Sequence, residues 1–127
     1  MLPVDLICSA IATQEGWFSL DPEVIPRRRN NPGDLLFRGQ IGASAPGWNK
    51  IGVPPIATFS SSKLGMAALY RQVWQFVAMG LTLREMIEGW APPSENDTAA
   101  YLANVLEWTK LPADTPIIDL LPPLQHA

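Results

Sequence analysis

Apolar residues recur with a helical period over the first fifteen positions of the chain. Their spacing of three or four residues places them on one stripe of a helix, which we predict from about Val4 to Glu15. The stripe comprises Val4, Ile7, Cys8 and Ile11. Glu15 continues it, and Gly16 is a residue type that commonly ends a helix. The pattern therefore places a carboxyl group in the last turn of a helix, on the face directed towards the core.

The same period and the signals at helix ends predict four further helices. They run from about Lys63 to Met79, from Leu83 to Trp90, from the Ser94–Thr98 segment to about Thr109, and from Ile117 to Leu121. The first of these is apolar over most of its circumference, so we expect it to be central and buried. Trp74 and Trp90 lie on apolar helical faces and are assigned to the core. Thr82 and Glu85 form a capping box before the second of these helices.

The segment between the first two long helices is predicted to hold irregular chain and a small β lobe. The Ile25–Pro26 pair is expected to prevent a helix between Trp17 and Arg29. Leu35–Phe37 and Ile56–Phe59 have the composition of short strands. The Gly39–Pro55 segment between them is rich in Gly, Pro and Ser, and we expect a long exposed loop there.

Length and composition limit the class of protein. The 127 residues, 47% hydrophobic and 17% charged, predict one folded domain over residues 1–127, with an ordered part from about residue 4 to 121 and a Pro-rich tail. A formal net charge of -3 gives no long-range attraction to nucleic acid or to an anionic membrane. No apolar run approaches the roughly 20 residues that span a bilayer. The first residues lack a basic segment, so no signal peptide is expected.

The scarcity of cysteine and histidine argues against several kinds of chemistry. Cys8 is the one cysteine, which excludes an internal disulfide, and we expect it to be a small core residue. His126 is the one histidine and lies in the tail, so a Ser-His or Cys-His catalytic pair is not expected. Without clustered His or Cys, neither a metal site nor a cofactor is predicted.

Three features each allow a structural and a functional interpretation. Glu15 is either an ordinary solvated residue or a buried carboxyl whose pKa is raised by desolvation, as a general acid requires. The Asn-Asn-Pro-Gly-Asp string at residues 30–34 is either a plain turn or a loop whose amides bind sugar hydroxyl and acetamido groups. Arg27–Arg29 is either a solvated turn or a contact for an anionic polymer.

Taken in order, these residues resemble a known family. The chain carries Gln14-Glu15-Gly16 at the end of its first helix, an Arg-Asn-Asn-Pro-Gly-Asp turn at residues 29–34, and a Trp-Ala-Pro-Pro-Ser-Glu-Asn-Asp-Thr string at residues 90–98. Together they resemble the small phage-encoded members of the lysozyme-like superfamily, which are similar to goose-type lysozymes and peptidoglycan lytic transglycosylases. The resemblance covers the chain from Ile11 to Leu121. It departs at Asp34, where such proteins more often carry Asn.

The resemblance implies a fold and a site. The fold is mainly α within the α+β class, with about five helices, a small β-hairpin lobe, and a cleft between lobes that binds alternating N-acetylglucosamine and N-acetylmuramic acid. Glu15 corresponds to the acid that protonates the glycosidic oxygen. Trp48, which lies outside the predicted helices, is expected to stack on sugar rings. The expected substrate contacts are Trp17, Asn30, Asn31, Gly33, Asp34, Ser94, Glu95, Asn96 and Tyr101.

The identity of a second carboxylate decides the reaction. Asp34, Glu95 and Asp97 are candidates, but each also has a structural explanation. The muramic acetamido group or 6-hydroxyl can instead act as internal nucleophile, so lytic transglycosylation with Glu15 as acid and then base is favoured over lysozyme-type hydrolysis. The alternatives are a non-catalytic virion or wall-binding module, and a helical interaction domain in which Glu15 faces solvent.

The same family resemblance predicts partners and location. Peptidoglycan glycan strands and phage virion proteins are the expected partners, with no nucleic acid and no membrane insertion. A monomer is expected, either in a phage virion or in a host cytoplasm, acting on the cell wall.

Overall fold

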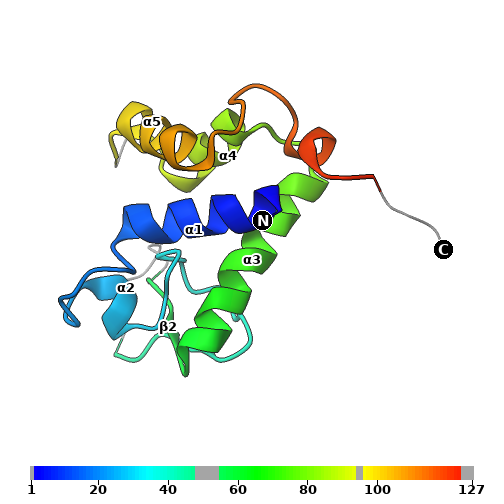
Figure 1. Cartoon of the computed structure of the whole chain (residues 1–127). Helices are drawn as coiled ribbons and strands as arrows, with labels where there is room; N and C mark the ends of the chain where they lie inside the picture. The colour runs from blue at the N-terminus through cyan, green and yellow to red at the C-terminus, as the bar shows by residue number, and fades with distance from the viewer. Residues whose placement is uncertain (1, 48–54, 94–95, 124–127) are drawn as a thin grey trace. The chain divides into compact units, whose positions relative to one another are not determined.

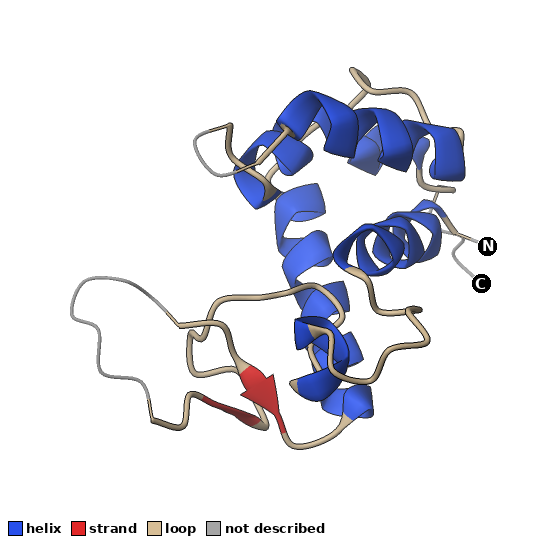
Figure 2. Ribbon diagram, turned by 90° about the vertical axis from the view of Figure 1, so that its left-hand side faces the viewer, coloured by secondary structure: helices blue, strands red, loops and turns tan. Residues whose placement is uncertain are grey.

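The computed structural model describes residues 2–47, 55–93 and 96–123. Over these residues the chain is mainly helical with one small antiparallel sheet (Figures 1 and 2). The elements are α1 (Pro3–Glu15), α2 (Ile25–Arg28), β1 (Ala43–Ser44), β2 (Thr58–Phe59), α3 (Ser62–Ala78), α4 (Leu83–Trp90), α5 (Thr98–Thr109) and the 3₁₀-helix η1 (Ile117–Leu120). The predicted class, mainly α with a small β part, is confirmed.

The chain divides into two compact units. The first comprises Met1–Ala10 and Val73–Ala127, and the second comprises Ile11–Gln72. The boundaries fall inside α1 and α3, so each of these helices contributes residues to both units. Each unit has its own buried side chains.

The first unit is built around the beginning of α1, the end of α3, and the pair α4 and α5, which lie beside each other (Figure 1). Its fully buried apolar side chains include Val4, Ile7, Cys8, Val73, Val77, Leu83, Met86, Ile87, Val105 and Ile117. In α1 these are the predicted stripe residues. In α3 only a narrow stripe is buried, and Trp74 is 43% exposed, so its assignment to the core is wrong. Trp90 is half-buried and packs edge-on against Phe76, with ring centroids 6.1 Å apart.

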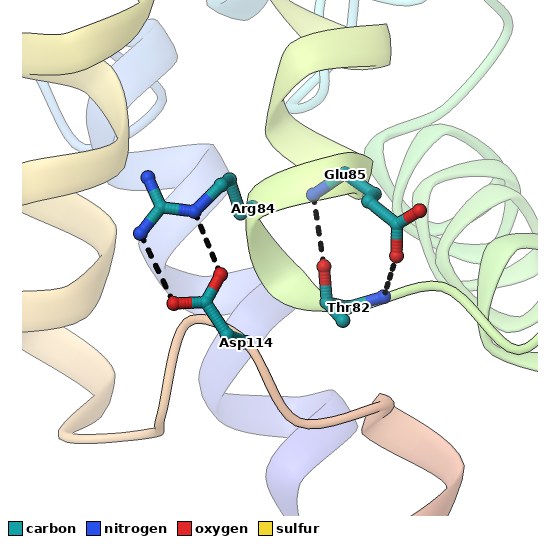
Figure 3. Close-up of polar contacts among 4 residues, drawn as sticks. All are labelled: Thr82, Arg84, Glu85 and Asp114. Carbon is teal, nitrogen blue, oxygen red and sulfur yellow. Dashed lines mark hydrogen bonds and ion pairs between the residues drawn. The ribbon is translucent and has the colours of Figure 1, made fainter.

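The start of α4 is fixed by reciprocal hydrogen bonds, as the sequence predicts. The Glu85 backbone N–H donates to Thr82 Oγ1 at 3.1 Å, and the Thr82 N–H donates to Glu85 Oε1 at 2.9 Å (Figure 3). Asp97 caps α5 in a similar way, with its carboxylate accepting from the Ala100 N–H at 3.1 Å. These side chains satisfy backbone donors that a helix leaves open at its first turn.

Two helical predictions need correction. A short helix, α2, lies where the sequence predicted irregular chain, because Pro26 occupies its first turn, where a missing N–H costs nothing. The last predicted helix, Ile117 to Leu121, is a 3₁₀ turn that ends one residue earlier.

The β lobe belongs to the second unit and differs from the prediction. β1 and β2 pair antiparallel, with Ala43 opposite Phe59, so one strand lies inside the predicted long loop. Leu35–Phe37 forms only an isolated bridge, between Leu36 and Ile56, instead of a strand. The Phe37 N–H donates to the carbonyl of Pro55 at 2.7 Å, but a proline has no N–H to return the bond. The ladder therefore does not extend.

The buried thiol of Cys8 gives the first testable prediction. Burial, and secondarily the charge of Asp5, raises the pKa of the Cys8 thiol from 9.0 to about 12. Because the thiolate is the reactive form, its fraction at pH 8 falls by about 10³ relative to an exposed thiol. We expect reaction with Ellman's reagent to be at least that much slower in the native protein than in urea. A native rate close to the unfolded one would contradict this burial.

Candidate functional site

Glu15 is held at the last residue of α1 by a defined turn. Gly16 takes the left-handed conformation, with φ +93°, and its N–H donates to the Thr13 carbonyl at 3.1 Å. The Trp17 N–H donates to the Ala12 carbonyl at 2.9 Å. This pair of bonds is the Schellman arrangement, which requires glycine where the chain turns. The backbone of Glu15 is therefore fixed from both sides, and its side chain is half-buried.

Asn31 is the centre of the turn that follows α2. Its side chain is 0% exposed. Its amide N–H₂ donates to the carbonyls of Leu35 at 3.0 Å and Ala57 at 2.9 Å, and its amide oxygen accepts from the Leu35 N–H at 2.8 Å. With both donors and the acceptor used inside the protein, the prediction that Asn31 contacts substrate is wrong. Gly33 is buried as well, so neither residue forms an exposed rim.

Neighbouring residues also connect this turn to β2 and to Ile56, which precedes β2 in the chain. The Arg29 guanidinium donates to the Ile56 carbonyl at 3.2 Å, and the Phe59 N–H donates to the Arg29 carbonyl at 2.8 Å. Asn30 is half-buried, and its amide donates to the Phe59 carbonyl at 3.1 Å. The turn at residues 30–34 is thus held by side-chain as well as backbone hydrogen bonds, and we call it the braced turn. Arg29 differs from Arg27 and Arg28, which are exposed and lie in the last turn of α2.

Gly65 in α3 lets the helix approach this turn. A Cβ atom at that position would lie 1.7 Å from the Asn30 carbonyl oxygen and 3.1 Å from Pro32 Cδ. Only a residue without a side chain fits between helix and turn. Neither Gly65 nor Arg29 individually was assigned a role from the sequence. A glycine inside a helical pattern was the available signal, since it often marks a close backbone approach.

Asp34 closes the turn in a strained and poorly solvated position. Its φ is +50°, a region that Asp and Asn tolerate better than most residues. One carboxylate oxygen, Oδ1, is buried and has no hydrogen-bond partner among the described residues, and the same holds for Arg29 Nε. Burial raises the pKa of the Asp34 carboxyl above its ordinary value of 3.8, and the charge of Arg29 opposes that shift without cancelling it.

Replacing Asp34 by Asn is expected to stabilise the protein at neutral pH by about 1 kcal/mol, because it replaces a partly buried negative charge by a neutral amide. The folded-state pKa is raised, so the unfolding free energy falls as pH rises from below 3.8 through that pKa. The increase in unfolding free energy caused by Asp34→Asn should therefore be complete at pH 7 and absent near pH 3. Urea unfolding at both pH values measures it.

Asp21→Asn provides the matched control, since Asp21 lies in an exposed turn and an Asn there can still accept from the Glu23 N–H. We expect that variant to change stability little at either pH. A loss of stability in Asp34→Asn at pH 7 would mean that the attraction of Arg29 outweighs desolvation.

The remaining predicted contacts divide between the two units. Trp17 is half-buried and belongs to the second unit with Glu15 and the turn. Tyr101 belongs to the first unit and is 5% exposed, so its ring is a core element and the prediction of a substrate contact is wrong. Asn96 is exposed in the first unit. Ser94, Glu95 and Trp48 lie outside the described residues.

The described residues hold neither a metal-binding cluster nor a membrane-spanning helix. No group of three or more His, Cys, Asp or Glu side chains within 2–47, 55–93 and 96–123 is arranged to hold a metal ion. Within those ranges no helix has both the length and the apolar character needed to cross a membrane.

Comparisons with protein-family models, with curated proteins and with solved structures find no match to this chain.

Proposed function

We propose that this chain is a peptidoglycan-cleaving glycosidase of the lysozyme-like superfamily, acting as a lytic transglycosylase with Glu15 as general acid and base. The observation that carries the proposal is that Glu15, a half-buried residue, ends α1 at a backbone position fixed by the Gly16 turn. A general acid needs a defined position and partial removal from water. The Asn–Pro–Gly turn, which is held by side-chain and backbone hydrogen bonds, belongs to the same compact unit as Glu15.

In the proposed reaction, Glu15 donates its proton to the oxygen of the bond between N-acetylmuramic acid and N-acetylglucosamine. The C1–O bond breaks and the N-acetylglucosamine hydroxyl leaves. The C6 hydroxyl of the same muramic residue then attacks C1, and the Glu15 carboxylate takes up its proton. The product carries a 1,6-anhydro ring, and Glu15 returns to its protonated form without any water being consumed.

The surroundings of two other carboxylates favour this route over hydrolysis. Hydrolysis with retention or inversion uses a second carboxylate that faces the sugar or a water molecule. Asp34 has one oxygen buried in the braced turn, and Asp97 uses its carboxylate to cap α5. An internal hydroxyl nucleophile makes a second carboxylate unnecessary.

Digestion of purified sacculi tests the proposal. Soluble fragments released by the purified protein are analysed by mass spectrometry, and we expect muropeptides with 1,6-anhydro ends. If the fragments carry reducing ends, the protein is a lysozyme-type muramidase and not a transglycosylase. If the protein binds sacculi but releases no fragments, both enzymatic proposals are wrong and the protein is a non-catalytic wall-binding module.

A further inference from the structure

A pocket of about 540 Å³ lies in the first unit, between the exposed side of α4 and the first turns of α5. Its lining includes Arg84, Glu88, Asn96, Asp97, Ala99 and Leu102. Leu102 is buried and Ala99 is small, so they give the pocket an apolar floor and wall. The volume and the mixed lining are those of a site for a small ligand.

The charges in the pocket are not balanced. Arg84 is engaged by Asp114, with Nε to Oδ1 at 2.7 Å and Nη2 to Oδ2 at 3.2 Å (Figure 3). Asp114 thereby offsets the guanidinium charge and orients the Arg84 side chain. Arg84 also interacts with the charge of Glu88. With Asp97, which accepts a hydrogen bond from the Ala100 N–H, three carboxylates therefore stand against one guanidinium. The pocket therefore has negative charge beside an apolar surface.

We propose that this pocket binds the aliphatic ammonium side chain of a diamino acid in a wall peptide. An alkyl ammonium group complements the lining in both respects. Its methylene stem covers the apolar surface of Leu102 and Ala99, and its positive end is attracted to Glu88 and Asp97. The inference rests on the proposed function, because a protein that cuts glycan strands meets the peptides attached to them. It adds a substrate contact on α4 and α5.

Binding of a synthetic tetrapeptide, L-Ala-γ-D-Glu-L-Lys-D-Ala, tests this site. Amide shifts of the ¹⁵N-labelled wild-type protein are followed during titration, and we expect movement at Glu88, Ala99 and Leu102. The same peptide acetylated at the lysine ammonium should bind about tenfold more weakly. Equal binding of the two peptides, or shifts confined to the second unit, would overturn the proposal.

Glu88→Gln removes one charge without touching the N-cap of α5, and we expect about a tenfold loss of affinity for the lysine peptide. Glu107→Gln is the control, since Glu107 lies near the other end of α5 and pairs with Lys110 at 2.9 Å. Unchanged affinity in Glu88→Gln would also overturn the site. If the protein binds the peptide but does not cleave sacculi, the proposed glycosidase function is wrong and the proposed peptide site stands.

Discussion

Replacing Glu15 by Gln is expected to lower the release of muropeptides from sacculi by about 10²–10⁴-fold, the usual contribution of a positioned general acid. Gln has nearly the same shape and can still take part in hydrogen bonds, but it cannot donate a proton to the glycosidic oxygen or accept one from the C6 hydroxyl. The Gly16 turn that holds the position involves only backbone atoms, so it should survive the substitution. Release is measured as initial rate, with anhydro-muropeptides quantified by mass spectrometry.

Glu23→Gln is the matched control, because Glu23 lies in the same compact unit and is exposed. We expect full release from that variant. Circular dichroism and thermal unfolding establish that Glu15→Gln remains folded. Full activity in a folded Glu15→Gln protein would remove Glu15 from the reaction, whatever bonds are cut.

The four long helices α1, α3, α4 and α5 were predictable because most of their ends are determined by neighbouring residues in the sequence. The Thr82–Glu85 capping box, the Asp97 cap and the Gly16 turn each act over three to five residues. Such local signals are present in the sequence itself. The same holds for the buried stripe of α1, where spacing alone identifies the core residues.

The role of the Asn-Asn-Pro-Gly-Asp turn was not predictable in the same way. Two asparagines suit a sugar site and a structural turn equally well, and only their partners distinguish the two roles. Those partners, Leu35, Ala57 and Phe59, lie 4 to 29 residues away along the chain. Most are backbone carbonyls, which have no residue-type signature. Tyr101 shows the same difficulty, since an aromatic residue near a helix start suits a cleft and a core alike.

Gly65→Ala is expected to destabilise the protein by about 3 kcal/mol, although alanine normally favours a helix over glycine by up to about 1 kcal/mol. The added Cβ would fall 1.7 Å from the Asn30 carbonyl oxygen, which belongs to backbone and has no rotamer to change. Either α3 or the braced turn must then move, and movement of the turn strains the hydrogen bonds of Asn30 and Asn31. Urea unfolding should show a lower midpoint with an unchanged slope.

Gly89→Ala is the same substitution in another helix, and we expect it to raise the free energy of unfolding instead of lowering it. Gly89 lies in α4, and a Cβ there would meet nothing within 4 Å among the described atoms. Helix propensity alone then acts, so we expect a gain of about 0.5 kcal/mol, reduced from the full value by the nearby helix end. If both variants were more stable to urea than the wild type, α3 and the turn would not be in close contact. A loss in Gly65→Ala alone would show that the missing side chain is what lets the helix support the turn.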